Sequence, residues 1–287
     1  MIFDSVRADI VEIGRRLWAR GFVASNDGNI SVRVAPDRLL MTPASVSKGF
    51  MTPDMMVVTD LNGAVVEAAP GRKPSSEALM HLVAYRQRPD VSAVVHAHPP
   101  TATGFAVAGI PLDRAVLAEV VTTLGSIPIA DYGTPSTREL ADTVAPLLRA
   151  HDAVLLANHG AIALGSDLFA AYYKMETIEH FARISLVARL LGGERLLSRE
   201  EVERLQNLRG RYGIASPAPL CPPDQPAVAD PSCQIIVAPS APGERLVADV
   251  QTASSADSAI GAGGEIRLTY AQLTALIEEV VGEVTKA

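Results

Sequence analysis

The stretch that most constrains the fold is a run of β-favouring residues that ends in two histidines and two prolines, at residues 94–100. Side chains alternate across a strand, so His96 and His98 point to the same side. Pro99 and Pro100 have no backbone N–H group, so the strand gives way to a loop there. Two imidazoles at such an edge, with rigid chain on one side and open space on the other, are well placed to bind a metal ion.

Two further residues are candidate metal ligands. Glu77 follows two serines and opens a helical pattern at residues 78–87, and His159 ends an apolar, strand-like run. Three imidazoles and a carboxylate are usual ligands of a zinc-like ion that keeps one position for substrate. A lone histidine is usually a surface or core residue, and a glutamate in the first turn of a helix is favourable without any catalysis. An H-x-H pair at a strand end, backed by a third strand-end histidine, is less easily explained in this way, and on spacing alone the metal site and these alternatives both stay open.

Apolar periodicity and capping residues divide the first three quarters of the chain into helices and strands. The expected helices cover residues 4–20, 78–87, 101–108, 134–150, 167–191 and 199–212, and the expected strands cover residues 30–34, 39–41, 55–59, 64–67, 94–98 and 153–157. Three histidines outside the metal pattern are expected to pack in the core or lie on the surface: His81, His151 and His180.

Composition excludes several classes of protein. The chain has 287 residues, 48% of them hydrophobic, which is enough for one sizeable core. A net charge of −7 without a basic stripe argues against nucleic acid as a partner. No signal peptide and no apolar run of membrane-spanning length is found, so we expect a cytoplasmic protein with no membrane partner. Cys221 and Cys233 are too few for a disulfide framework, and we expect exposed spectator thiols.

Five short motifs occur in order along the chain: Gly28-Asn29-Ile30-Ser31, Met41-Thr42-Pro43, Lys73-Pro74-Ser75-Ser76-Glu77, His96-Ala97-His98-Pro99 and Asn158-His159-Gly160. Over about residues 5–212 they resemble the zinc-dependent class II sugar-phosphate aldolases of the aldolase/adducin family. The resemblance implies an α/β fold with a central, mainly antiparallel sheet flanked by helices, plus an extended C-terminal tail. It also implies one Zn²⁺ per subunit, a small-molecule sugar phosphate as substrate, and a homotetramer with its sites at subunit interfaces.

The resemblance also implies roles for individual residues. Glu77 would be the acid/base group and a metal ligand, beside the zinc ligands His96, His98 and His159. The residues that would bind the substrate phosphate are Gly28, Asn29, Ala44, Ser45, Ser75 and Ser76. The turn at Gly28 supports this role independently, because glycine lets backbone amides approach a phosphate and the Asn29 and Ser31 side chains add donors; a plain turn is the alternative.

This sequence departs from the family pattern at two places. The family usually has a glycine where Ser45 stands, which weakens the expectation of phosphate binding there. A tyrosine that protonates the aldehyde oxygen in the family aldolase has no counterpart between Pro111 and Pro128. Glu119 and Tyr132 are the remaining candidates for this second proton donor, acting across a subunit boundary.

The reaction implied is retro-aldol cleavage of a ketose 1-phosphate, of the L-fuculose 1-phosphate or L-rhamnulose 1-phosphate type, to dihydroxyacetone phosphate and lactaldehyde. A sugar-phosphate 4-epimerase or a dehydratase on the same metal site is one alternative, which the missing tyrosine keeps open. A non-catalytic, adducin-like interaction module is the other. A site without catalytic activity would not be expected to retain all four of these residues. The presence of Glu77, His96, His98 and His159 therefore argues against this alternative.

The C-terminal quarter has a different composition. The expected organisation is a catalytic domain at residues 1–212, a Pro/Ala/Ser/Gly-rich linker at 213–264 and an amphipathic helix at 265–287. A helix on such a linker resembles the targeting peptides of enzymes packed in bacterial microcompartments. We therefore expect a shell or cargo protein as a partner and the microcompartment lumen as the more specific location, with a helix that folds back on its own tetramer as the alternative.

Overall fold

The computed structural model describes residues 3–214, 218–222, 232–239 and 245–246. The helices are α1 (Asp4–Ala19), α2 (Ala78–Gln87), α3 (Pro100–Val107), α4 (Ala118–Thr123), α5 (Arg138–Leu148), α6 (Leu168–Leu190) and α7 (Arg199–Arg209), with short 3-10 turns η1 (Lys48–Phe50), η2 (Pro53–Met55) and η3 (Gly210–Tyr212). The strands are β1 (Asn29–Ala35), β2 (Arg38–Met41), β3 (Val57–Asp60), β4 (Val65–Glu67), β5 (Ala93–Ala97), β6 (Ile129–Ala130), β7 (Ala153–Leu156), β8 (Gly160–Gly165), β9 (Glu194–Arg195) and β10 (Arg245–Leu246).

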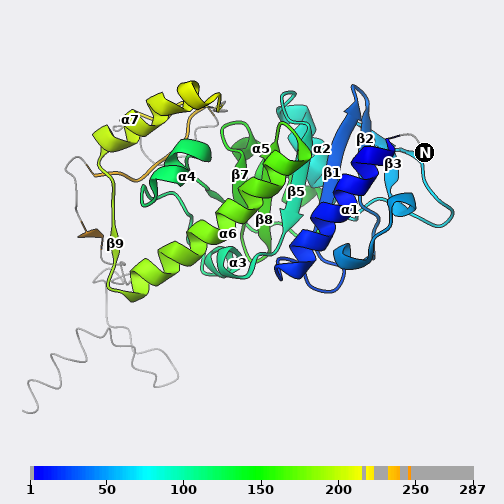
Figure 1. Cartoon of the computed structure of the whole chain (residues 1–287), viewed down its shortest axis with the longest axis horizontal. Coiled ribbons are helices and arrows are strands. Elements are labelled where there is room, and N and C mark those ends of the chain that lie inside the picture. Colours follow the sequence, from blue (N-terminus) through cyan, green and yellow to red (C-terminus); the bar gives the residue numbers. More distant parts are fainter. Residues whose placement is uncertain (1–2, 215–217, 223–231, 240–244, 247–287) are drawn as a thin grey trace, which may run out of the picture. The chain divides into compact units, whose positions relative to one another are not determined.

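The centre of the fold is an eight-stranded sheet with the order β4-β3-β2-β1-β5-β8-β7-β6. Neighbouring strands are antiparallel except β6 and β7, which are parallel. Helices flank this sheet (Figure 1). The predicted α/β fold with a central, mainly antiparallel sheet is therefore confirmed. Strand β8 and helix α4 were not predicted, because neither carries a clear periodic pattern.

The two faces of the sheet pack against different helices. Along β5, Ala93, Val95 and Ala97 belong to the core with α1, α3 and α6, whereas Val94 belongs to the core with α2 and α5. This alternation follows from the two-residue repeat of a strand. It places His96 on the face of α2, the helix that Glu77 precedes.

A third, smaller core joins α4 and α7 to a C-terminal segment, residues 232–239. Ala115, Val121, Val202 and Ile236 form this core, and the amide of Val237 donates to the carbonyl of Asp113 at 2.9 Å. The described part of the expected linker is therefore packed on the fold. The rest of the linker and the amphipathic helix at 265–287 lie outside the described residues, so this division of the chain remains a prediction.

The expectation of two exposed spectator thiols is wrong. Cys221 and Cys233 form a disulfide with a Cα–Cα distance of 4.9 Å, and they are 8% and 5% exposed. The prediction failed because Cys233 lies in the segment that packs on α4 and α7, a contact that leaves no periodic signal in the sequence. Separately, no helix among the described residues has the length and apolarity that crossing a membrane requires.

Candidate active site

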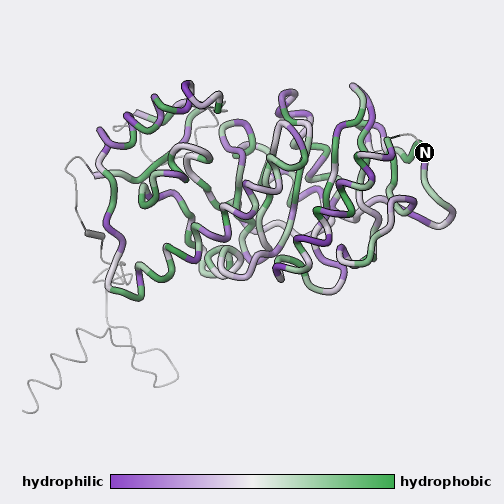
Figure 2. The backbone as a smooth tube through the Cα atoms, in the orientation of Figure 1, coloured by the Kyte–Doolittle hydropathy of each residue, from purple (hydrophilic) through white to green (hydrophobic). Residues whose placement is uncertain are grey.

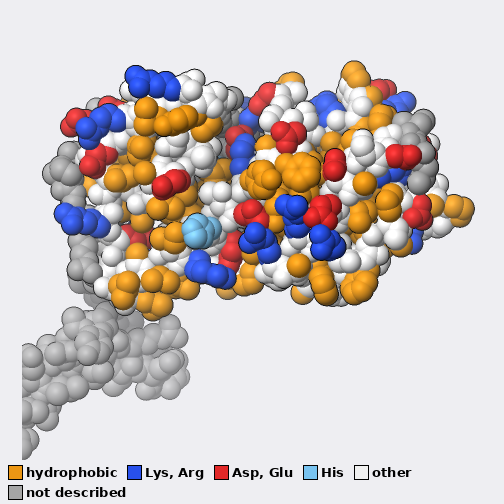
Figure 3. Space-filling view, viewed as in Figure 1, with side chains coloured by type: hydrophobic (Ala, Val, Ile, Leu, Met, Phe, Trp, Pro, Cys, Tyr) orange, Lys and Arg blue, Asp and Glu red, His pale blue; other side chains and the backbone are white. Residues whose placement is uncertain are grey.

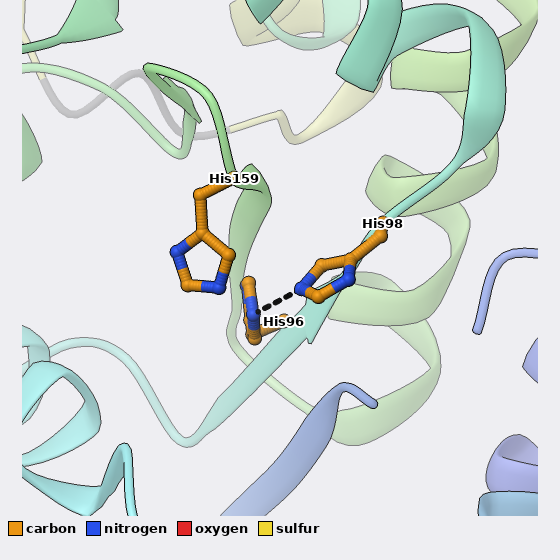
Figure 4. Close-up of side chains that lie close together, drawn as sticks. All are labelled: His96, His98 and His159. Atoms are coloured by element: carbon orange, nitrogen blue, oxygen red, sulfur yellow. Dashed lines mark hydrogen bonds between the residues drawn. The ribbon is translucent and has the colours of Figure 1, made fainter. Parts of the chain in front are cut away.

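Three histidines meet at one edge of the sheet, where β5 ends and β7 turns into β8. His96 lies in β5, His98 follows that strand by one residue, and His159 lies in the β7–β8 turn (Figure 4). Their ligand nitrogens all lie within 4.8 Å of one another, and the Nε2 atoms of His96 and His98 are 3.1 Å apart. The structure thus brings the three predicted metal ligands together.

Two glycines let the neighbouring strands approach the histidine-bearing strand closely. Gly28 has a φ of +70°, and a Cβ atom there would lie 2.9 Å from the carbonyl oxygen of His96. On the other side of β5, a Cβ atom at Gly160 would lie 2.6 Å from the carbonyl oxygen of Ala97. Both distances are shorter than real Cβ contacts, so a larger residue at either position would push β1 or β8 away from the site.

Glu77 reaches the histidines from the start of α2. Its Oε2 atom is 3.3 Å from Nε2 of His96, and its Oε1 atom is 3.1 Å from Nε2 of His159. The helix begins at Ala78 as expected, and Glu77 is its N-cap without a side-chain capping bond. The carboxylate is free of capping because it turns toward the histidines.

Burial and charge set the protonation states of the site. Burial alone would raise the pKa of Glu77, but the adjacent His96 and His159 hold that pKa well below its usual value. Burial, with the neighbouring His96 and His159, lowers the pKa of His98 to about 3. Near neutral pH the site therefore holds an ionised carboxylate and a neutral His98, which are the forms that bind metal ions.

The donor set fits a divalent, zinc-like ion. The Nδ1–H group of His96 donates to the carbonyl of Ala161 at 2.9 Å, so the Nε2 atom of His96 keeps its lone pair for a ligand. Oε1 of Glu77 and Nδ1 of His159 are buried without a hydrogen-bond partner among the described residues. Converging lone pairs and an unpartnered buried carboxylate oxygen are unfavourable without a cation between or beside them.

The loops expected to bind phosphate lie against each other. The amide of Ala44 donates to the carbonyl of Lys73 at 2.9 Å, and the amide of Ser75 donates to the carbonyl of Thr42 at 3.1 Å. Ser45 is exposed and has a φ of 58°, which explains why the family usually has glycine there.

Two expected phosphate contacts have other partners in this structure. Asn29 is 3% exposed. The Nδ2 atom of its side-chain amide donates a hydrogen bond to Oε2 of Glu77 at 2.8 Å. The hydroxyl of Ser75 accepts a hydrogen bond from the amide of Glu77 at 3.3 Å, while the neighbouring Ser76 is exposed. Phosphate binding by these residues stays a prediction, and the structure adds a role for Asn29 in holding Glu77.

The two candidates for a second proton donor make no polar contact with the three histidines or Glu77 among the described residues. Glu119 is exposed in the first turn of α4, and Tyr132 is 55% exposed after β6. Their role therefore remains a prediction that depends on a neighbouring subunit.

A histidine that the motifs did not include lies directly behind the site. His81 is 1% exposed, and its Nε2 atom is hydrogen-bonded to Oδ1 of Asn29. The sequence signal was the spacing of four residues from Glu77, which places both side chains on one helix face. We expected packing for His81 because the spacing alone does not show that a polar partner faces it.

Comparisons with known proteins agree with this fold. The family model of the class II aldolase and adducin N-terminal domain matches residues 8–186. The 5-deoxy-D-ribulose 1-phosphate aldolase of Bacillus thuringiensis is 34% identical over 214 residues, which are 74% of this chain and 99% of that protein. The 3-oxo-tetronate 4-phosphate decarboxylase of Haemophilus influenzae is 31% identical over 208 residues, 70% of this chain and 96% of that protein. A solved structure of an L-fuculose 1-phosphate aldolase is 33% identical with a TM-score of 0.68, and the match covers 72% of this chain and 97% of that one.

The three converging histidines form a group that could hold a metal ion, and the class II aldolase family is generally metal-dependent. The chain belongs to the class II aldolase and adducin family. Its likeness to L-fuculose 1-phosphate aldolase, in sequence and in fold, confirms the resemblance read from the five motifs and supports a sugar-phosphate aldolase enzyme. The relatives differ in substrate, so the family does not fix the sugar.

Proposed function

We propose that this protein is a zinc-dependent aldolase that cleaves the C3–C4 bond of a ketose 1-phosphate to dihydroxyacetone phosphate and a small aldehyde. With L-fuculose 1-phosphate or L-rhamnulose 1-phosphate the aldehyde would be lactaldehyde. The observation that carries the proposal is the contact of the ionised Glu77 with two of the three converging imidazoles. This arrangement places a proton-transfer group beside the site where a metal ion would hold the substrate.

His96, His98 and His159 would hold the zinc ion, with Glu77 as a further ligand before substrate binds. A bound zinc ion supplies Lewis-acid stabilisation of negative charge on the substrate's oxygens. The hydrogen bond from His96 to Ala161 fixes the orientation of that imidazole, and the burial of His96 keeps bulk water from it.

Glu77 would move the proton that the reaction requires. In the cleavage direction the C4 hydroxyl loses a proton, the C3–C4 bond breaks, and the bonding electron pair remains on C3. A single carboxylate that accepts the C4 hydroxyl proton and delivers it to C3 accounts for both proton transfers of the reaction. Because Asn29 donates to Oε2, Oε1, which lies 3.1 Å from Nε2 of His159, is the oxygen that would be available for this transfer.

Phosphate binding would come from the paired loops that contain residues 42–45 and 73–76, together with the turn at Gly28. The backbone hydrogen bonds from Ala44 to Lys73 and from Ser75 to Thr42 support this assignment, since they join the two loops. Glu119 and Tyr132 remain the candidates for a second proton donor from a neighbouring subunit. Either would replace Glu77 as the group that takes the C4 hydroxyl proton.

The homotetramer and the microcompartment location are further parts of the proposal. The C-terminal end of α6 has exposed apolar side chains, with Leu190 and Leu191 at 78% and 76% exposure, and Figures 2 and 3 show this hydrophobic end beside β9. Such a surface supports contact with another subunit. Docking to a shell or cargo protein would use the helix at 265–287, outside the described residues.

A second candidate reaction is decarboxylation of a 3-oxo sugar-acid phosphate. The likeness to the decarboxylase of Haemophilus influenzae favours it. Loss of carbon dioxide also leaves an electron pair on a carbon next to a carbonyl, and Glu77 would complete the reaction by passing to that carbon a proton taken from water. The two reactions differ in the bond that breaks and can be separated by their products.

The test is product analysis with the purified, zinc-loaded protein. The substrates would be L-fuculose 1-phosphate, L-rhamnulose 1-phosphate, 5-deoxy-D-ribulose 1-phosphate and 3-oxo-tetronate 4-phosphate. Dihydroxyacetone phosphate released from any of the first three by the wild type, and not by Glu77→Gln, supports the aldolase. Carbon dioxide from the fourth alone would replace it with the decarboxylase. An epimer would identify the epimerase, and a dehydrated ketone would identify the dehydratase. A protein that forms no product and also fails to bind the added zinc would favour the non-catalytic module.

A further inference from the structure

A row of buried polar side chains connects Glu77 with the interior of the protein. Oδ1 of Asn29 is hydrogen-bonded to Nε2 of His81, and Nδ1 of His81 lies 2.6 Å from the hydroxyl of Ser31. That hydroxyl lies 2.9 Å from the phenol of Tyr85. The side chains behind Glu77 are at most 3% exposed, so bulk water does not supply alternative partners.

The elements that carry this row bring it together by their own periodicity. Glu77, His81 and Tyr85 are spaced by four residues, so they follow one face along α2. Asn29 and Ser31 are spaced by two residues on β1, so they share the face of the sheet that α2 covers. The row is therefore a structured contact between one helix face and one strand face.

The direction of every hydrogen bond follows from the contact between Asn29 and Glu77, in which Nδ2 of Asn29 donates to Oε2 of Glu77. A carboxylate only accepts, so Asn29 must present its amide nitrogen to Glu77 and its oxygen to His81. His81 must then donate from Nε2 and accept at Nδ1 from the Ser31 hydroxyl. Burial lowers the pKa of His81 to about 3, which agrees with a neutral ring of a single tautomer.

The far end of the row is consistent with this direction. Ser31 donates to His81, so its oxygen is left to accept from the phenol of Tyr85. Burial raises the pKa of Tyr85, so the phenol keeps its proton. Each donor in the row points toward Glu77, and a change at His81 removes the donor that the Asn29 side-chain oxygen accepts from.

We propose that His81 is a positioning residue: by donating from Nε2 to Asn29, it fixes the amide so that Asn29 donates to Glu77 and holds the carboxylate beside the metal ligands. Without this donor the buried Oδ1 of Asn29 loses its hydrogen-bond partner, so the amide is fixed at one end only and holds the carboxylate less firmly. The effect on turnover rests on the proposed function, whereas the tautomer of His81 and the orientation of Asn29 do not.

The first test is independent of activity. Solid-state NMR of protein with ¹⁵N-labelled histidine rings resolves the tautomers of the six histidines, and the spectrum of His81→Gln identifies the signal of His81. We expect a neutral, Nε2–H ring. A protonated ring or an Nδ1–H ring would overturn the proposal, whatever reaction the protein catalyses.

The second test compares three variants by steady-state kinetics on whichever substrate proves active. His81→Leu removes the donor and should lower kcat about 10- to 100-fold, with KM changed less than about threefold. His81→Gln retains an amide N–H that can reach Asn29 and should recover kcat to within about fivefold of the wild type. His151→Leu is the matched control, because His151 is a 5% exposed histidine at the opposite end of β7 from His159.

The outcomes separate positioning from a merely structural role. Loss of kcat in His81→Leu with rescue in His81→Gln, while His151→Leu keeps its kcat, supports the proposal. Equal loss in the leucine and glutamine variants, in proportion to a shared fall in melting temperature, would overturn it. If no substrate is turned over, zinc affinity replaces kcat in the same comparison, and the NMR result still decides the tautomer.

Discussion

The Nε2 atoms of His96 and His98 lie 3.1 Å apart, although the Nδ1–H group of His96 is already committed to the carbonyl of Ala161. This relationship fixes which nitrogen of His96 is the ligand, because a neutral imidazole has one lone-pair nitrogen. The main chain of β8 would therefore orient His96 in the proposed metal site before any ion binds, through one hydrogen bond between neighbouring strands.

Removing one imidazole should release the metal. We expect His159→Ala to bind zinc at least about 100-fold more weakly than the wild type, since a direct ligand is lost. Zinc content after dialysis and competition with a chelator measure this. His180→Ala is the control, because His180 is exposed on α6 and should leave zinc binding unchanged. Equal zinc affinity in His159→Ala would remove this residue from the site.

Replacing Glu77 by glutamine should separate chemistry from folding. Glutamine has nearly the same shape but cannot accept and return a proton, so we expect kcat to fall about 10²- to 10⁴-fold. The melting temperature should change little, and zinc should remain bound by the three histidines. Glu203→Gln, at an exposed position of α7, should keep full activity. A Glu77→Gln enzyme of normal kcat would show that another group moves the proton.

Much of this site could be predicted from the sequence because its residues stand at the ends of strongly patterned elements. The apolar runs before His96 and His159 identify strand ends, and the serines before Glu77 identify a helix start. Each of these features depends on one short segment, so the residue pattern of that segment is enough to predict where the strand ends or the helix begins. The antiparallel sheet came from the family resemblance, since no single segment shows which strands are neighbours.

The contacts that the sequence did not reveal join segments far apart in the chain. The bond between Asn29 and His81 crosses from a strand to a helix, and neither local pattern shows that the other residue faces it. The pairing of Cys221 with Cys233 depends on how an irregular segment folds back on α4 and α7. Tertiary packing decides both, and periodicity carries no information about it.

A methyl group at Gly28 should damage the site through the backbone. Gly28 has a φ of +70°, and an added Cβ atom would lie 2.6 Å from Cγ1 of Val23 and 2.9 Å from the carbonyl oxygen of His96. Gly21 has nearly the same φ of +69° but no atom within 4 Å of such a Cβ. The two alanine variants therefore share the backbone strain and differ in the clash.

We expect Gly21→Ala to lose about 1–2 kcal/mol of stability, as the left-handed conformation of a non-glycine residue predicts. Gly28→Ala should lose more, by about 1–3 kcal/mol from overpacking, and should also bind zinc less tightly because β1 moves away from His96. Chemical denaturation and zinc titration of both variants check this. Equal stability and equal zinc affinity would show that the site tolerates movement of β1.

The stability of the protein should depend on pH through Lys48. Its side chain is 2% exposed, its Nζ atom donates to the carbonyls of Asn26 and Val46, and burial lowers its pKa to about 8. The unfolded state keeps the usual pKa of 10.5 and therefore binds more protons between pH 8 and 10.5. Stability should rise with pH across this window, by about 3 kcal/mol at most.

Comparison with Lys48→Met isolates this contribution. The methionine variant lacks the titrating group, so the difference in unfolding free energy between the two proteins should change in favour of the wild type from pH 8 to 10.5. Below pH 8 the difference should be constant, because the lysine is protonated in both states. A difference that stays flat over the whole range would mean that the folded protein leaves the pKa of Lys48 unshifted.

The disulfide should contribute stability that reductant removes. It links residues 12 apart, and closing a loop of this length in the unfolded chain is worth about 3 kcal/mol. Reduction should also loosen the segment that covers Val121 and Val202, since the pair of backbone hydrogen bonds between residues 219–221 and Gln234 loses its covalent support. The melting temperature of the wild type should fall on adding dithiothreitol.

The double variant Cys221→Ser/Cys233→Ser supplies the control for this last effect. It should melt near the temperature of the reduced wild type and should not respond to dithiothreitol. The metal ligands lie on β5 and the β7–β8 turn, outside the third core, so zinc affinity should be the same in both proteins. A wild type that melts identically with and without reductant would show that this segment holds its place by packing alone, through Ile236 and the hydrogen bonds to Asp113 and Ala115.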